Sequence, residues 1–335
     1  MGHARDYTPA VKFGHKWYPE DLVLGQGIFG DYYYVDYLNG SDDNVGTSVE
    51  SAFKTLGQAH TAVTSNHGDV VYLNGTTGEH LKESAMLDWS KNRISVVGIG
   101  PSGVADPQPE IQLSAAGNAA DNAATLKVSG YGNSFTNLYI SNAGTHASSL
   151  SALWDAGENN TYNNCQFAKF SDLDETGVAN VIGRGDTTTW RNCKFGVTWV
   201  TVEVARAGLW AKGIGGAGRM QSNYFENCKW VVSSDDADYD HFRVYDNNSL
   251  AFENVFVNPV FYSTLIASVG AVITTTAVES SAALADGSIL LINPACNTTN
   301  LCTVNDQVKV VGPSMSLDGG AAAVGTTLGI GQTPE

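Results

Sequence analysis

A six-residue phrase occurs five times between Phe135 and Val257, and it constrains the fold more than any other feature of the chain. The phrase contains an aromatic residue, any residue, Asn, a small apolar residue, any residue, and an aromatic or aliphatic residue. Its asparagines are 27, 28, 35 and 27 positions apart: Asn137, Asn164, Asn192, Asn227 and Asn254. A repeat of this length indicates stacked supersecondary units, because each unit is too short to bury its own apolar face.

Within each phrase, the apolar positions 1, 4 and 6 surround a turn residue and predict a tight turn followed by a short strand. A stacked Asn can hydrogen-bond along the stack, and its backbone tolerates the left-handed geometry of the turn. Three successive phrases place a cysteine after the Asn, at Cys165, Cys193 and Cys228. We interpret these cysteines as a buried, unlinked stack of small apolar side chains.

This combination of Asn, aromatic and cysteine positions resembles the right-handed parallel β-helix superfamily, also described as the pectate-lyase-like fold. The resemblance implies an all-β solenoid in which each coil contributes strands to parallel sheets. It covers roughly residues 32 to 260 and places Asn137, Asn164, Asn192, Asn227 and Asn254 in one stack.

The segment before the repeats has an order of elements of its own. Residues 32–36 read as a strand, Thr47 to Thr64 as a helix with Thr47 and Glu50 at capping-box spacing, and residues 69–73 as a buried strand. The order is similar to the N-terminal entry of many bacterial and phage β-helix proteins. There the helix covers the open end of the first coil, which protects its core and strand edges.

Two smaller features of this entry have alternative interpretations. Gly40, Ser41 and Asp42 could form a metal-binding loop, but the same residues are typical of an ordinary turn, which we favour. His60 lies on or beside the apolar face of the predicted helix, where we expect a packed side chain rather than a metal ligand.

The chain divides into three parts. Residues 1–31 form an arm with five aromatic residues, which pack either on their own solenoid or on a neighbouring molecule. Residues 32–262 form the capped β-helix. After Tyr262 the chain contains no aromatic residue, and we expect residues 263–335 to form a small C-terminal β module that finishes the rod or joins subunits, followed by a flexible tail.

The net charge and the cysteine content limit which partners the protein can bind and in which compartment we expect it. The formal net charge of -16 argues against nucleic acid or an anionic membrane as a main partner. The start of the chain has no apolar signal core, so we expect a protein that stays in the cytosol or is released by lysis. Most of the five cysteines fit a reduced core, although Cys296 and Cys302 are close enough in sequence to pair in an oxidising medium.

Candidate catalytic groups are few. Polysaccharide hydrolases need paired carboxylates, and the nearest set is Asp235, Asp236 and Asp240 in the loop after the fourth phrase. These acids could cut a sugar chain, bind calcium, or form a solvated acidic loop, which is the commonest role of such a sequence. The histidines have no metal-ligand spacing, and we expect neither a cofactor nor a metal.

These observations favour a structural virion protein of a tailed phage: a rigid rod that serves as a capsid decoration or cement protein, or as a head or tail appendage. The alternative is a carbohydrate-binding or carbohydrate-degrading β-helix of the tailspike type, a glycoside hydrolase or polysaccharide lyase. We expect no enzymatic activity. The expected partners are other capsid or tail proteins and further copies in a homotrimer, with surface glycans as an open alternative. The expected location is the virion, assembled in the host cytoplasm.

Overall fold

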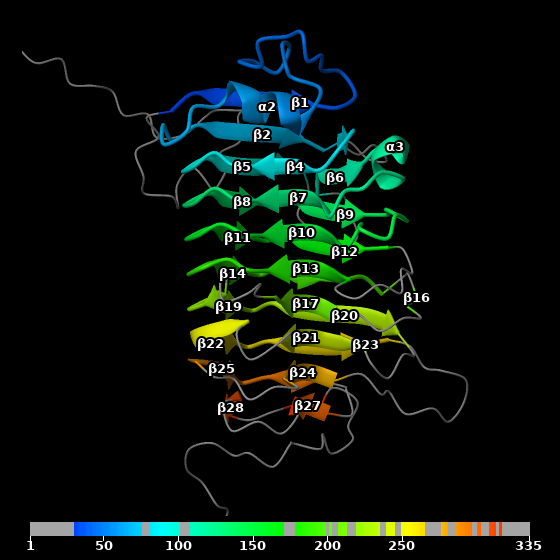
Figure 1. The fold of residues 1–335 in the computed structure, drawn as a ribbon. Coiled ribbons are helices and arrows are strands. Elements are labelled where there is room, and N and C mark those ends of the chain that lie inside the picture. Colours follow the sequence, from blue (N-terminus) through cyan, green and yellow to red (C-terminus); the bar gives the residue numbers. More distant parts are fainter. Residues whose placement is uncertain are drawn as a thin grey trace, which may run out of the picture.

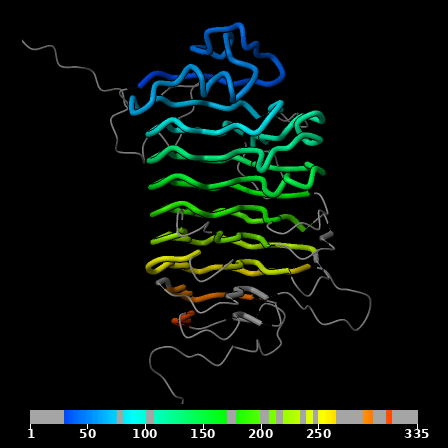
Figure 2. Tube along the Cα trace, in the orientation of Figure 1, coloured from blue at the N-terminus to red at the C-terminus, as the bar shows by residue number. Residues whose placement is uncertain are grey.

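The chain folds into a right-handed parallel β-helix, shown by a computed structural model (Figure 1). Figure 2 shows the coils of the trace stacked from the N-terminal to the C-terminal part of the chain. The structure describes residues 30–75, 81–100, 108–170, 178–198, 201–202, 207–212, 219–234, 239–244, 249–264, 276–280, 286–296, 300–302, 308–312 and 315–316.

Three parallel sheets, called I, II and III, form the sides of the solenoid. After the first strand, the chain passes through sheet I, then sheet II, then sheet III in each coil. Sheet I contains β1 (Tyr32–Asp36), β2 (Val70–Asn74), β5 (Ser95–Ile99), β8 (Ser134–Thr136), β11 (Thr161–Asn163), β14 (Thr189–Arg191), β19 (Tyr224–Glu226), β22 (Leu250–Val257), β25 (Asp286–Ile292) and β28 (Val308–Val311), and β18 (Met220–Gln221) also pairs with β22.

Sheets II and III follow the same order along the rod. Sheet II contains β3 (Leu81–Glu83), β6 (Glu110–Leu113), β9 (Tyr139–Asn142), β12 (Gln166–Lys169), β15 (Lys194–Phe195), β20 (Lys229–Ser234), β23 (Val260–Ser263), β26 (Ala295–Cys296) and β29 (Met315–Ser316), with β16 (Thr201–Val202) paired to β20. Sheet III contains β4 (Leu87–Trp89), β7 (Ala124–Val128), β10 (Ser151–Asp155), β13 (Ala179–Gly183), β17 (Ala207–Ala211), β21 (Asp240–Val244), β24 (Thr276–Ser280) and β27 (Asn300–Cys302).

The first position of the phrase forms an aromatic stack through the core. Ring centroids of successive coils lie 5.2, 4.2, 5.7 and 4.4 Å apart, in the order Phe135, Tyr162, Trp190, Phe225 and Phe256. The rings of each pair are close to parallel, and all five side chains are buried. Stacked rings add attraction beyond the area that they bury, so this column stabilises the register of each coil on the next.

The predicted position of Asn254 in the Asn stack is wrong. Phe225 pairs with Phe256 rather than with Phe252, so the fifth coil starts its phrase four residues later and its turn residue is Asn258. Asn258 has the left-handed φ of 51° and donates from Nδ2 to Oδ1 of Asn227 at 3.0 Å. Asn254 is buried elsewhere, where its Oδ1 accepts from the main-chain N–H of Asn223.

From the coil of β8 to the coil of β25, the turn between sheets I and II is therefore made by one asparagine per coil. We call this edge of the rod the Asn corner. Its members all have φ between 51° and 56°, and they are Asn137, Asn164, Asn192, Asn227, Asn258 and Asn293.

The expected capping helix is present, but its predicted start is wrong. The helix α2 spans Leu56–Ala62, and Thr55 rather than Thr47 is its N-cap, accepting from the N–H of Gln58. The residues just before it are extended, because Phe53 exchanges main-chain hydrogen bonds with β1. The predicted apolar face is confirmed, since Leu56, Ala59 and Val63 are buried in the main core together with Phe53. A second short helix, α3, spans Ala115–Asn118.

The loop before α2 uses Asp42 for turn chemistry. One carboxylate oxygen of Asp42 accepts from the N–H groups of Lys54 and Thr55, each at 2.9 Å, and the other accepts from Oγ1 of Thr55 at 3.0 Å. The side chain therefore stabilises the entry into the helix. His60 is half-buried against Trp89, and its Nε2 accepts from the N–H of Ser90.

The cysteine prediction is confirmed. Cys165, Cys193 and Cys228 are buried and form no disulfide, and each Sγ donates to a main-chain oxygen of the preceding coil. Burial raises the pKa of the Cys193 thiol well above its usual range. The side chain of Cys302 lies outside the described part, so its pairing with Cys296 stays a prediction.

The strands from β24 to β29 continue all three sheets beyond residue 263. The boundary of a separate C-terminal module stays a prediction, as does the role of the N-terminal arm, of which residues 1–29 lie outside the described part. Among the helices that the structure describes, none has the length and apolar character needed to cross a bilayer.

Candidate functional site

Only Asp240 of the three predicted acids lies in the described part of the chain, so the predicted catalytic set stays a prediction. Asp235 and Asp236 lie outside the described residues. Asp240 is 2% exposed in β21, and its carboxylate accepts from Nε of Arg243 three residues later. The cation on its own strand compensates this buried carboxylate, and removing either partner would leave an uncompensated charge.

The outer face of sheet III carries a row of large side chains, which lie outside the repeated phrase and were not predicted from the sequence. Strand register places Lys127 beside Trp154, Trp154 beside Ile182, Ile182 beside Trp210, and Trp210 beside Arg243. The alternating neighbours on the same strands, such as Leu153 and Leu209, belong to the main core, so the row faces outward. In Figure 1 the strands that carry it lie directly above one another.

Each tryptophan in the row contacts two cations. Nζ of Lys127 and Cζ of Arg184 lie 5.3 and 5.5 Å from the ring centroid of Trp154. Nζ of Lys212 and Cζ of Arg243 lie 5.8 and 5.6 Å from the ring centroid of Trp210. Contacts at these distances hold a cation against the ring face. We call this set, with Ile182, the Trp–cation row.

The cations of this row differ in the hydrogen bonds that the structure describes for them. Lys127 donates to Asp88 at 2.8 Å, and Arg243 donates to Asp240. Nε of Arg184 has no hydrogen-bond partner in the described part of the chain, and burial lowers the pKa of Arg184. Burial and the nearby charge of Arg184 lower the pKa of Lys212. An anion bound beside Arg184 would supply the partner that its Nε lacks in the described part of the chain and would replace lost hydration.

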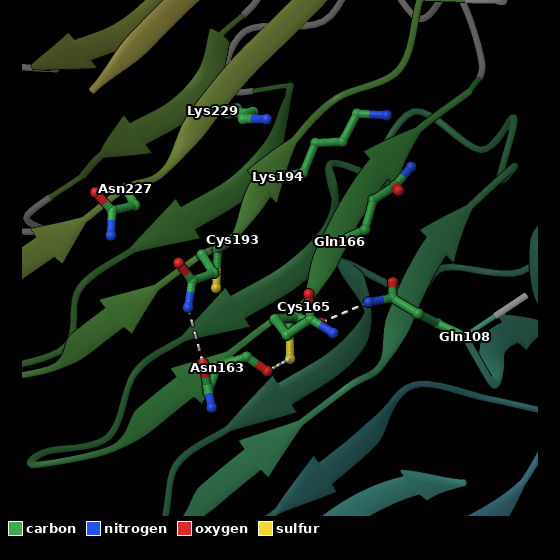
Figure 3. Close-up of a pocket in the computed structure, with 10 residues that line it drawn as sticks. Gln108, Asn163, Cys165, Gln166, Cys193, Lys194, Asn227 and Lys229 are labelled. Atoms are coloured by element: carbon green, nitrogen blue, oxygen red, sulfur yellow. Dashed lines mark hydrogen bonds between the residues drawn. The ribbon is translucent and has the colours of Figure 1, made fainter. Parts of the chain in front are cut away.

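A cavity of about 670 Å³ lies at the Asn corner, on another side of the rod (Figure 3). Amide, thiol and ammonium groups line it, and the residues are Gln108, Asn163, Asn164, Cys165, Gln166, Asn192, Cys193, Lys194, Asn227 and Lys229. We call it the corner groove. Gln108 closes one end by donating from Nε2 to the main-chain oxygen of Asn164 at 2.6 Å. Asn192 crosses it by donating to Oδ1 of Asn163 at 3.5 Å.

Position five of the phrase supplies the basic side of the groove. Strand register places Gln166, Lys194 and Lys229 in one outward-facing line on sheet II, and Figure 3 shows Gln166 and Lys194 projecting on the same side. Lys194 is half-buried, and its pKa is lowered by burial and then by the charge of Lys229. The sequence contains this signal, a run of Gln, Lys and Lys at position five of the phrase, which the apolar positions and the Asn position do not reveal.

One group of described residues has metal-ligand spacing, with ligand atoms of Asp31, His67 and Asp69 within 4.8 Å of one another. Asp69 is fully buried, and its oxygens already accept from the N–H of Asp31, Nδ1 of His67 and the N–H of Thr64. These contacts are sufficient to explain the group as a structural link between β1, α2 and β2.

Comparison with protein-family models gives no match to the sequence, and comparison with curated proteins gives none either. Solved structures do match. A pectin methylesterase from Aspergillus niger in deglycosylated form has a TM-score of 0.58 at 14% identity, over 90% of this chain and 91% of that chain. Pectate lyase Pel9A has a TM-score of 0.51 at 16% identity, over 87% and 71%. A pectin methylesterase in complex with hexasaccharide VII has a TM-score of 0.50 at 12% identity, over 87% and 91%. These likenesses show the shared β-helix fold alone.

Proposed function

We propose that this chain is a structural virion protein of a tailed phage, a rigid β-helical rod within a capsid decoration or a head or tail appendage. The observation that supports the proposal best is the continuity of the stack. Parallel strands from β1 to β28 pair without interruption in sheet I, and stacked rings fill the core beneath them. A solenoid of this kind resists bending, since each coil is bonded to both neighbours along its length.

The test of the virion role is copurification with intact particles from lysates of the infected host. We expect the chain to sediment with particles at a fixed copy number, measured by quantitative mass spectrometry, and to appear as rods in particle images. A chain that stays in the soluble fraction while particles assemble normally would contradict the proposal.

The Trp–cation row favours a second candidate function, the binding of an acidic polysaccharide. Arg184, Lys212 and Arg243 come from three successive coils, about 4.8 Å apart, and this spacing suits a linear chain with repeated negative groups. The proteins of similar fold named above are pectin methylesterases and a pectate lyase, which supports a sugar acid polymer as the first ligand to test.

Affinity electrophoresis in gels that contain polygalacturonate tests this candidate, with neutral dextran as the comparison polymer. We expect retardation by polygalacturonate only, and about tenfold weaker binding after combined Arg184→Gln and Lys212→Gln substitutions, which corresponds to about 1.4 kcal/mol. Lys82→Gln, an exposed lysine of sheet II, is the matched control and should bind as the natural chain does. Equal retardation of the double variant would exclude the row as the site.

The same samples test catalysis, because release of reducing sugar ends measures hydrolysis or lysis directly. We expect no release from polygalacturonate. If release occurs and survives alanine at Asp235, Asp236 and Asp240, the predicted acids are not its catalytic groups.

A further inference from the structure

Phe252 is an exposed aromatic residue held in a costly backbone conformation. Its side chain is 67% exposed, and its φ of 54° lies in the left-handed region. A bulky residue there costs roughly 1–2 kcal/mol relative to an ordinary conformation. The same conformation is adopted in three preceding coils by Asn159, Thr187 and Ser222, which have smaller polar side chains than Phe252.

β22 contains one extra residue next to Phe252, between Ala251 and Val255. Gln221 pairs with Ala251 and Tyr224 pairs with Val255, so two residues on one coil face three on the next. An insertion of this kind bends a strand and redirects a side chain. The result is a knob formed by Phe252 and the exposed acid Glu253.

The edge of sheet I that carries the knob is acidic. Glu158 and Asp186 lie just before the left-handed positions of their own coils, and isolated bridges join Glu158 to Asp186 and Asp186 to Gln221. Together with Glu253 they give this edge negative charge next to one large apolar side chain. Such a surface complements a basic partner surface with room for an aromatic ring.

The chain itself contains a surface of that description. The corner groove lies at the opposite edge of sheet I, encloses about 670 Å³, and carries Lys194 and Lys229 on paired strands. Burial and the charge of Lys229 lower the pKa of Lys194, so an incoming carboxylate would stabilise its charged form. In a chain with a net charge of -16, a groove lined by two lysines and several amides is a distinctive acceptor.

We propose that the knob of one copy inserts into the corner groove of the next copy, with Glu253 against Lys194 and Lys229 and Phe252 against the groove wall. The knob and the groove are different surfaces, so the contact is heterologous, and it must either close into a ring or continue as a filament. The two surfaces bound the same side of a three-sided rod. If sheet I faces a threefold axis, the knob of one copy lies next to one neighbour and its corner groove lies next to the other. Three such contacts close the assembly as a trimer of parallel rods. This inference adds an assembly contact to the virion role and does not depend on it.

Sedimentation velocity and native mass spectrometry over a range of protein concentrations test the contact. We expect a species of three times the 35.5 kDa protomer mass. Phe252→Ser should weaken assembly at least tenfold, since serine occupies the same left-handed position in the preceding coil. Tyr131→Ser, which removes another exposed aromatic residue, is the matched control and should assemble normally. A monomer at about 100 µM, or a trimer that Phe252→Ser leaves unchanged, would overturn the proposal.

A charge exchange identifies the partner surfaces even if one variant lowers stability. Glu253→Lys and Lys229→Glu should each weaken assembly about tenfold, and the chain that carries both should recover to within about threefold of the natural chain. Both residues are exposed, so thermal unfolding of each variant is expected to match that of the natural chain. Recovery supports the direct contact, whereas additive losses in the double variant would overturn it.

Discussion

Both edges of sheet I have a turn residue with left-handed φ in successive coils, but the residue types differ between the two edges. At the Asn corner, every described turn residue from Asn137 to Asn293 is asparagine. At the opposite edge, which we call the mixed corner, the left-handed positions are occupied by Arg93, Gly132, Asn159, Thr187, Ser222 and Phe252. The φ angles at both corners lie between 51° and 67°, so backbone geometry alone does not select asparagine.

Side-chain hydrogen bonding along the stack makes the difference. At the Asn corner, Nδ2 of Asn164 donates to Oδ1 of Asn137 at 2.9 Å, and Asn293 donates in the same way to Asn258 at 3.3 Å. At the mixed corner, the amide ladder lies one position further along the chain and is buried. There Oδ1 of Asn160 accepts from the N–H of Asn133, and Oδ1 of Asn223 accepts from the N–H of Thr188. The left-handed position at that corner is consequently free to vary.

The interior behind the two corners also differs. Cys165, Cys193 and Cys228 lie behind the Asn corner and make it apolar. Behind the mixed corner lies Asp155, which is 1% exposed and accepts from the hydroxyl of Tyr162 and from Oγ1 of Thr188. Burial raises the pKa of Asp155 to about 7.

The largest expected effect comes from placing a charge behind the Asn corner. Cys193→Asp should lower the free energy of unfolding by about 4–5 kcal/mol, because an unpaired carboxylate would enter an apolar stack. Cys193→Ala is the control and should cost about 1–2 kcal/mol. Urea unfolding monitored by circular dichroism gives both values. Equal losses for the two variants would mean that the interior behind the Asn corner is not apolar.

The buried carboxyl group of Asp155, behind the mixed corner, should instead make the free energy of unfolding depend on pH. The folded-state pKa of Asp155 is above its unfolded value, so its contribution to stability is present at low pH and is lost as the pH rises through about 7. Between pH 5 and pH 8 this loss is about 3 kcal/mol, and Asp155→Asn should abolish it.

Unfolding of both chains at each pH isolates the contribution of Asp155. The comparison is needed because buried His241, whose pKa is lowered to about 3, contributes the opposite trend below its unfolded value. Parallel pH profiles for the natural and Asp155→Asn chains would refute the assignment.

The two amide ladders should differ in their contribution to stability. Asn223→Ala should cost about 2 kcal/mol, because it leaves the N–H of Thr188 and the main-chain oxygen of Gly185 buried without their present partner. Asn192→Ala, at an exposed position of the Asn corner, should cost about 1 kcal/mol, which is the conformational cost of alanine at positive φ. The difference between the two unfolding free energies tests the comparison, and its absence would show that burial of the ladder is unimportant.

The smallest expected effect is a gain in stability. Phe252→Gly should stabilise the isolated chain by about 1 kcal/mol, because glycine adopts the left-handed conformation without a steric cost. Ser222→Gly, at the equivalent position of the preceding coil, should give a smaller gain. If Phe252→Gly destabilises the monomer, the exposed ring has packing contacts in its own chain that oppose its role as a knob.

Much of the fold followed from local chemistry in the phrase. A turn residue between apolar positions recurs at intervals that suit one coil, and stacking of equal side chains then requires parallel strands. The buried cysteines followed for the same reason, since Cys165, Cys193 and Cys228 occupy one position of one repeated unit.

The register of the last phrase did not follow from the sequence alone. Phe252 and Phe256 both begin a segment that fits the phrase, and only contact with Phe225 selects Phe256, whose ring lies 4.4 Å away. The helix start was missed for a similar reason. Thr47 has suitable capping spacing, but pairing of Phe53 with β1 keeps the chain extended until Thr55.

What the sequence by itself determined is therefore the repeating unit: its left-handed Asn turn, its aromatic and thiol core, and the parallel stack that these impose. Only the tertiary structure decided which outward-facing side chains meet. Lys194 and Lys229 are 35 residues apart in the sequence, and Arg184 and Lys212 are 28 residues apart, yet strand register brings each pair to one surface. The physical reason is that burial acts on inward positions of every coil and leaves a periodic signal, whereas outward positions acquire a function only through neighbours on other coils.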